Sequence, residues 1–332
     1  MRALIVLPGA LGDVIRGLPL AGRLRRAQPA ATIGWVVEPL SAPLLEGNRW
    51  LDTVHRFERR RGVKGYLEVM REIRRGGYEV TLDLGRSAKS ALLARGSGAP
   101  RRIGFARIDA REGAWLAATE HLAPQGVERS KLDQFLAFGD HLGVRDAMID
   151  FGLAPSAAEA SAARAVLGAT SAPIVAACVG SSCPSRRWWP GRTAAVLDAL
   201  HSRYGTTAIV LGAPADVAFG GAVAANARSP VRDLTGRTTL RELLALLAES
   251  RLAFGPDSGA LHLAAAVGVP VVSLWGATSA LRSAPSASEH LVVAGRAPCS
   301  PCFLTHCPIG RVCMRTIEVG HVVDLAAEAL AA

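Results

Sequence analysis

Short apolar runs alternate with helical patterns along the whole chain. The runs typical of buried strands lie at residues 3–7, 32–37, 79–84, 174–178, 207–211, 252–254 and 271–275. Helical periodicity is found between them, for example at 14–28 and 238–249, and the alternation starts again near residues 150–170. Strands alternating with helices predict parallel sheets covered on both faces. We therefore predict an α/β protein with two doubly wound parallel-sheet domains, residues 1–165 and 166–332.

The segment 254–276 joins a polar turn, a short apolar helix and a buried strand. Asp257, Ser258 and Gly259 end one strand and offer N-cap chemistry for the helix that follows. The first N–H groups of a helix are unpaired and its dipole is positive at that end, so such a turn favours an anion. We expect a ligand site here. His262 lies inside the same helix, where it is either a packed helix residue or a contact to phosphate or sugar.

The composition favours anionic partners. The chain has 332 residues, enough for two domains, and its 38 Lys and Arg against 28 Asp and Glu give a net charge of +10. An arginine- and alanine-rich composition is also typical of a biased genome, so both explanations stay open. Neither a signal peptide nor an apolar run long enough to span a bilayer is visible, which predicts a cytoplasmic protein able to contact a membrane peripherally.

A glycine-bearing loop follows the first predicted strand at residues 8–13. It has neither the GxGxxG pattern nor the lysine of a P-loop, so a dinucleotide site or a P-loop is not favoured. Asp13 stands at the start of the next helix. It is either an N-cap or a functional carboxylate at the edge of a parallel sheet where ligands of open α/β folds bind.

A second glycine-bearing loop follows the strand at 174–178. It carries Ser181 and Ser182, with Arg187 shortly after them. Hydroxyl groups and arginine forks suit a diphosphate, although the loop is also consistent with a packed Trp-Trp-Pro segment beside solvated arginines. Asp216, after the next strand, is either a turn residue or a ligand contact.

Four cysteines lie within 15 residues near the C-terminus: Cys299, Cys302, Cys307 and Cys313. The first two have the C-x2-C spacing of a metal knuckle, and a set of four thiols suits zinc or iron. The short gaps that follow differ from those of a zinc ribbon, so packed reduced thiols are the alternative. We expect a structural Zn or Fe site here.

Basic residues are concentrated in the first half of the chain, where they favour an anionic acceptor over a merely solvated surface. They are Arg59, Arg60, Arg61, Lys64, Lys89, Arg101, Arg102 and Arg107.

Taken in order, these motifs resemble those of the lipopolysaccharide heptosyltransferases, glycosyltransferase family 9. The matching segments, which cover nearly the whole chain, are 11–14, 83–84, 89–90, 187–190, 211–216, 233–240, 257–262, 276–278 and 313–315. Each motif is weak alone, and the ordered set is specific.

The resemblance implies a GT-B fold, in which two Rossmann-like domains face each other across a cleft. It implies transfer of heptose from ADP-L-glycero-D-manno-heptose to Kdo or heptose of the lipopolysaccharide inner core, with inversion and without a metal for catalysis. The N-terminal domain would bind an anionic lipid-linked acceptor at the inner-membrane surface, and the C-terminal domain the nucleotide sugar. The last helix would be able to pack back on the N-terminal domain.

The predicted site residues come from the resemblance where a matching segment covers them, and otherwise from the loop and charge patterns described above. Asp13 would be the general base. The donor-binding residues would be Ser181, Ser182, Arg187, Asp216, Asp257, Ser258, Gly259 and His262. The acceptor-binding residues would be Gly12, Arg60, Lys89 and Arg107. Arg187 stands where relatives often have lysine, and the four-cysteine segment occurs in only part of the family, including protein-directed enzymes that bind iron through it.

Two alternatives compete with this prediction. The same fold could use another nucleotide sugar or a protein acceptor. A nucleic-acid-binding protein with a four-cysteine knuckle is the non-enzyme alternative, but only 5% of the residues are aromatic and they do not alternate with basic ones, so we expect no nucleic-acid partner.

Overall fold

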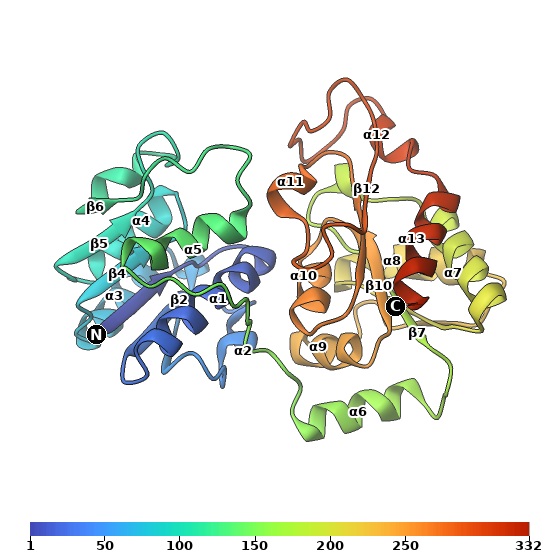
Figure 1. Cartoon of the computed structure of the whole chain (residues 1–332), viewed down its shortest axis with the longest axis horizontal. Coiled ribbons are helices and arrows are strands. Elements are labelled where there is room, and N and C mark those ends of the chain that lie inside the picture. The colour runs from blue at the N-terminus through green and yellow to red at the C-terminus, as the bar shows by residue number, and fades with distance from the viewer. Residues whose placement is uncertain (332) are drawn as a thin grey trace. The chain divides into compact units, whose positions relative to one another are not determined.

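A computed structural model describes residues 1–331 of the chain. They divide into two compact units, the first Met1–Leu153 and the second beginning at Ala154. Each unit is a parallel sheet with helices on both faces (Figure 1). The predicted α/β architecture of two doubly wound domains is therefore confirmed.

The sheet of the first unit has the strand order β3-β2-β1-β4-β5-β6, all parallel. Its strands are β1 (Arg2–Val6), β2 (Thr32–Val37), β3 (Thr53–Arg56), β4 (Val80–Asp83), β5 (Arg101–Gly104) and β6 (Glu120–His121). Its helices are α1 (Leu11–Ala27), α2 (Ala42–Leu45), α3 (Gly62–Arg75), α4 (Ala88–Gly96) and α5 (Lys131–His141), with short 3-10 turns η1 (Arg59–Arg61) and η2 (Ala114–Ala117).

Strand β1 shows why the sheet is apolar on both faces. Ala3 and Ile5 belong to a core cluster that includes residues of α1 and α5, whereas Leu4 and Val6 belong to a second cluster with residues of α3 and α4. Successive side chains of a strand point to opposite faces, so a central strand covered by helices on both sides must be apolar throughout.

The second unit repeats this topology, with the order β12-β11-β10-β7-β8-β9 among its described residues. Its strands are β7 (Ile174–Cys178), β8 (Thr207–Leu211), β9 (Val231–Asp233), β10 (Leu252–Pro256), β11 (Val271–Trp275) and β12 (Val292–Ala294). Its helices are α6 (Ala157–Leu167), α7 (Pro190–Tyr204), α8 (Val217–Asn226), α9 (Leu240–Ala248), α10 (Gly259–Ala266), α11 (Ala280–Ser283), α12 (Val312–Arg315) and α13 (Val319–Ala331), with 3-10 turns η3 (Pro184–Arg186) and η4 (Pro214–Asp216).

Both sheets have the strand order of a Rossmann fold, 3-2-1-4-5-6 when the strands of each unit are numbered from its own start. The order reverses between β1 and β4 in the first unit and between β7 and β10 in the second. Ligands of such folds bind beyond the carboxyl ends of the strands at this reversal, the topological switch point. The topology therefore indicates one ligand-binding edge on each unit.

Helix α6 packs against α9 and belongs to the second unit, so the units separate after Leu153, ahead of this helix. Helix α13 packs against α7 and against β10 and β11, all within the second unit. The assignment of acceptor and donor to the two domains stays a prediction.

Among residues 1–331, none of the helices has both the length and the apolar composition that a membrane span requires.

Gly255, in β10, is a position where the fold requires glycine. Its φ of +155° is unusual for other residues, and a Cβ there would lie 2.1 Å from the carbonyl oxygen of Cys178. We predict that Gly255→Ala destabilises the second unit by roughly 1–3 kcal/mol or more, because backbone atoms must move apart. The matched control, Gly221→Ala in α8, has open space around its Cβ and should be neutral or stabilising by up to about 1 kcal/mol.

The free energy of unfolding of the two variants, measured in urea, checks this prediction. Equal unfolding midpoints for Gly255→Ala and Gly221→Ala would contradict it.

Candidate functional site

Asp13 lies at the switch point of the first unit, in the first turn of α1 after β1. The N-cap position is held by Ala10, whose carbonyl accepts the backbone N–H of Asp13 at 2.9 Å. Asp13 is therefore inside the helix, and the N-cap explanation of this aspartate is wrong. Its carboxylate lies at the carboxyl edge of the sheet, in the first turn of α1.

Two cations hold the Asp13 carboxylate. The ammonium group of Lys131, at the start of α5, lies 2.8 Å from Oδ1 and 3.1 Å from Oδ2. The guanidinium of Arg16, one turn further along α1, pairs with the same carboxylate. The Asp13 side chain is still 25% exposed, so a substrate can reach it. Sequence reasoning missed Lys131 because it is 118 residues away and no local pattern marks the contact.

Asp83 ends β4 and pairs in register with Val6 of β1, so it lies on the other side of the same switch point. Burial raises the pKa of Asp83 to about 6, although hydrogen bonds from Ser90 and from the backbone N–H of Gly85 favour its charged form. A carboxyl group with a raised pKa is thus placed on the strand next to β1, which leads into the Asp13 loop.

The four residues predicted to bind the acceptor lie in segments that follow β1, β3, β4 and β5. Parallel strands place all of these segments at the carboxyl edge of the first sheet. Lys89 forms an ion pair with Glu38 at 2.8 Å, Arg60 is exposed in η1, and Arg107 stacks over the ring of Trp115. Gly12 is in the first turn of α1 beside Asp13. Their role in acceptor binding stays a prediction.

At the switch point of the second unit, two arginines are each paired with a buried carboxylate. Arg187 donates to Oδ1 of Asp216 at 2.5 Å, and the other oxygen of Asp216 accepts the backbone N–H of Ala213 at 3.0 Å. Arg186 lies 3.0 Å from Oδ2 of Asp257. The Arg186 pair was missed by sequence reasoning. Buried charges need such partners, and the pairs fix where both guanidinium groups lie.

Asp257 connects three neighbouring loops of the second unit. Its carboxylate accepts the hydroxyl of Thr278 at 2.8 Å in addition to Arg186, and its backbone carbonyl accepts the hydroxyl of Ser181 at 3.2 Å. Ser181 follows β7 and Thr278 follows β11, on either side of β10 in the sheet. The structure therefore brings the predicted donor residues of the β7 and β10 loops together.

Within the Asp257-Ser258-Gly259 turn, for which the sequence predicts N-cap chemistry, Ser258 occupies the N-cap position of α10 but its side chain makes no capping hydrogen bond in the described part of the chain; α10 begins at Gly259. The hydroxyl oxygen of Ser258 is buried and has no hydrogen-bond partner among residues 1–331. His262 is buried in the first turn of the same helix, and Ser182 is exposed after β7. An unpaired hydroxyl beside the N-terminus of a helix is suited to accommodate an anionic ligand.

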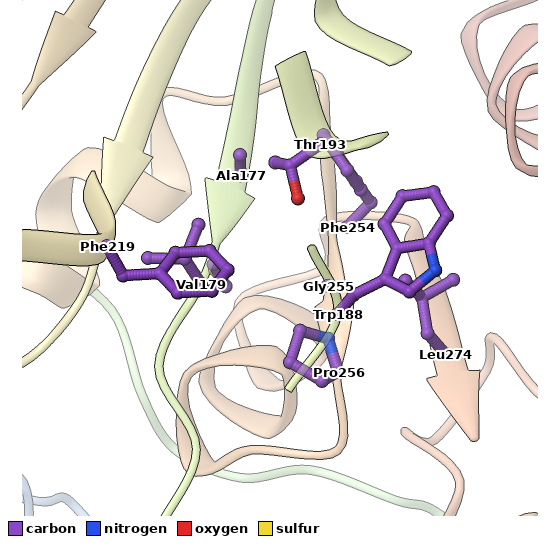
Figure 2. A pocket seen from close by; sticks show the side chains of 10 residues that line it. Ala177, Val179, Trp188, Thr193, Phe219, Phe254, Gly255, Pro256 and Leu274 are labelled. Atoms are coloured by element: carbon purple, nitrogen blue, oxygen red, sulfur yellow. The ribbon is translucent and has the colours of Figure 1, made fainter. Parts of the chain in front are cut away.

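A small apolar pocket lies behind these loops. Figure 2 shows its lining side chains at the ends of β7 and β10, with Trp188 on one side and Phe219 on the other. The hydroxyl of Thr193 is satisfied by the carbonyl of Trp189 at 3.2 Å. No charged side chain of residues 1–331 lines this pocket, so it is not suited to bind an anion.

The predicted structural Zn or Fe site at the four cysteines is wrong. Among residues 1–331, no group of three or more His, Cys, Asp or Glu side chains is placed to hold a metal ion. Cys313 is buried in the core and burial raises the pKa of its thiol, whereas Cys299 is exposed. Cys302 is partly exposed, and the sulfur of Cys307 accepts the backbone N–H of Arg311 at 3.1 Å.

Comparison with known proteins identifies the class of protein. Glycosyltransferase family 9 (heptosyltransferase) matches residues 66–312, which is most of the chain. The chain belongs to this family and is a glycosyltransferase, as the motifs had indicated.

The chain aligns with most of the length of two curated relatives. The chain is 25% identical over 279 residues to the lipopolysaccharide core heptosyltransferase OpsX of Haemophilus influenzae, covering 83% of this chain and 79% of the relative. It is 25% identical over 326 residues to lipopolysaccharide heptosyltransferase 1 of Pseudomonas aeruginosa, covering 92% and 87%.

Solved structures confirm the GT-B fold expected from the resemblance. A family 9 glycosyl transferase from Veillonella parvula gives a TM-score of 0.86 at 22% identity, covering 99% of this chain and 97% of that one. The Escherichia coli heptosyltransferase WaaC with ADP gives 0.75 at 21% identity, covering 100% and 99%.

The raised pKa of Asp83 predicts a pH dependence of stability. In the unfolded chain the pKa is near 3.8, and in the folded protein it is about 6. The folded state keeps a proton that the unfolded state loses, so this stabilisation is complete below about pH 4 and is lost as the pH rises to about 6. The loss should be about 3 kcal/mol.

Asp83→Asn removes this titration and should flatten the fall in unfolding free energy between pH 4 and 6. Glu128→Gln, a change at an exposed carboxyl group, is the control. Identical pH profiles of wild type and Asp83→Asn in urea unfolding would contradict the prediction.

Proposed function

We propose that this glycosyltransferase moves heptose from ADP-L-glycero-D-manno-heptose to an inner-core lipopolysaccharide sugar, either Kdo or heptose, with inversion. The observation that carries the proposal is Asp13, a partly exposed carboxylate at the switch point of the first unit that does not cap its helix. The names of both curated relatives, which are lipopolysaccharide heptosyltransferases, support the donor sugar and the acceptor class.

Asp13 acts as the general base in this proposal. The acceptor hydroxyl oxygen attacks the anomeric carbon while the bond from that carbon to the ADP oxygen breaks, and Asp13 takes the hydroxyl proton. A single displacement inverts the anomeric configuration. Lys131 and Arg16 contact the carboxylate from two elements, α5 and α1, and so restrict its orientation toward the acceptor.

The loops of the second unit bind the ADP moiety. The Nε atoms of Arg186 and Arg187 are buried without a hydrogen-bond partner among residues 1–331, and so is the Ser258 hydroxyl. Diphosphate oxygens would accept from such donors. The N-terminus of α10 stabilises the negative charge that develops on the leaving ADP. The other donor residues are Ser181, Ser182, Asp216, Asp257, Gly259 and His262. The structure of WaaC with ADP, which has the same fold, supports the nucleotide class.

The acceptor is an anionic lipid-linked sugar bound by the first unit. Lys89, Arg60 and Arg107 supply positive charge at the same sheet edge as Asp13 and Gly12. A lipid-linked acceptor places the reaction at the inner membrane, on its cytoplasmic side, with peripheral contact of the protein.

Substitution of the base tests the proposal. Asp13→Asn should lower the rate of heptose transfer by about 10²- to 10⁴-fold, because the amide cannot take the proton, while the Kd for ADP stays within about twofold. Rates are measured with ADP-heptose and a Kdo-terminated acceptor, and binding by calorimetry. Asp140→Asn is the matched control: Asp140 also pairs with an α1 arginine, Arg23, at 2.9 Å. Transfer by Asp13→Asn at the rate of Asp140→Asn would contradict the role of the base.

A further inference from the structure

A segment between β12 and α12 crosses the loops at the switch point of the second unit. We define residues 299–311 as the strap. It contains three of the four C-terminal cysteines, Cys299, Cys302 and Cys307. Its hydrogen bonds to the neighbouring loops indicate a structural role for the strap in the donor site.

The strap is hydrogen-bonded to the loop after β7 by backbone and side-chain groups. The N–H and hydroxyl of Ser185 donate to the carbonyls of Thr305 and Leu304, at 3.1 Å and 2.5 Å. The guanidinium of Arg311 donates to the backbone carbonyl of Arg187 at 2.7 Å. The backbone segment that carries Arg186 and Arg187 is thus hydrogen-bonded to the strap.

The strap is also bonded to the loop after β11. The backbone N–H of Phe303 donates to the carbonyl of Ala277 at 2.7 Å, and the hydroxyl of Ser300 donates to the carbonyl of Gly276 at 2.5 Å. Strands β7 and β11 flank β10 in the sheet. The strap therefore links the two loops on either side of Asp257, which Asp257 itself also joins through Arg186 and Thr278.

Both the guanidinium and the backbone N–H of Arg311 make contacts that fix them. Its guanidinium stacks over the ring of Trp189, 4.4 Å from the centroid, and its backbone N–H donates to the sulfur of Cys307. Burial lowers the pKa of Arg311. A guanidinium that is partly desolvated and stacked on a ring has few alternative orientations. The hydrogen bond from Arg311 therefore restricts the position of the Arg187 carbonyl.

We propose that Arg311 is a positioning residue of the donor site, which fixes the main chain of Arg187 so that its guanidinium is pre-oriented for a diphosphate. The inference rests on the proposed function of these loops in ADP binding. Asp216 orients the Arg187 side chain and Arg311 holds the backbone from which that side chain extends. Without Arg311, part of the binding free energy is lost in ordering the loop.

The test is a double-mutant cycle read by calorimetric titration with ADP. Arg311→Met keeps the aliphatic stem over Trp189 but removes the donor, and it should raise the Kd for ADP at least about tenfold. Arg311→Lys, which restores a donor, should recover part of this loss. Arg315→Met, in the same turn of chain but exposed, is the matched control and should stay within about twofold. Because Arg311 acts through Arg187, Arg311→Met should add less than about twofold in an Arg187→Ala background.

Three results would overturn the inference. They are a Kd within twofold of wild type for Arg311→Met, losses that multiply in the double variant, and failure of Arg311→Lys to improve on Arg311→Met. Arg311→Ala gives the same comparison if the methionine variant does not fold. Wild type that binds neither ADP nor ADP-heptose would instead contradict the proposed function and this inference together, whereas normal wild-type binding with an unaffected Arg311→Met contradicts this inference alone.

Discussion

The reversal of strand order at the centre of each sheet is the constraint on which the candidate site depends. Where crossovers leave two adjacent parallel strands toward opposite faces, the edge between them stays uncovered. Asp13 and Asp83 stand at this edge of the first unit, and the Ser181 and Asp257 loops at that of the second. A carboxylate buried at such an edge either pairs with a cation, as Asp216 and Asp257 do, or has its pKa raised, as Asp83 does.

The carboxylates at the two edges differ in their exposure and in their cationic partners. In the second unit Asp257 and Asp216 are almost completely buried, and each has one arginine, so the carboxylates act on the site through Arg186 and Arg187. In the first unit the carboxylate of Asp13 remains partly exposed between cations. A buried carboxylate orients a cation for an anionic ligand, whereas an exposed one can take a proton. This division suits an enzyme with donor and acceptor on separate domains.

The features that could be predicted best from the sequence are those that depend on the local pattern of residues. Strands β2, β8 and β11 were predicted with their observed bounds because they are short, mainly apolar runs that are buried in the sheet. Helix α8 was missed, since its glycine pair and lack of a polar face give no helical periodicity. The Asp13 and Asp257 loops were recognisable as polar turns after strands, but their partners Lys131 and Arg186 depend on tertiary contacts. The metal prediction failed because cysteine spacing does not determine how the thiols are oriented in the fold, and no group able to hold a metal forms among residues 1–331.

The most direct test of the account is the product of the reaction with ADP-heptose and a Kdo-terminated lipid acceptor, with the new linkage analysed by NMR. We predict one heptose per acceptor, released ADP, and an anomeric configuration opposite to that of the donor, because a single base and a single displacement carry the transfer. A retained configuration would contradict the role of Asp13. Turnover of another nucleotide sugar but not of ADP-heptose would contradict the function.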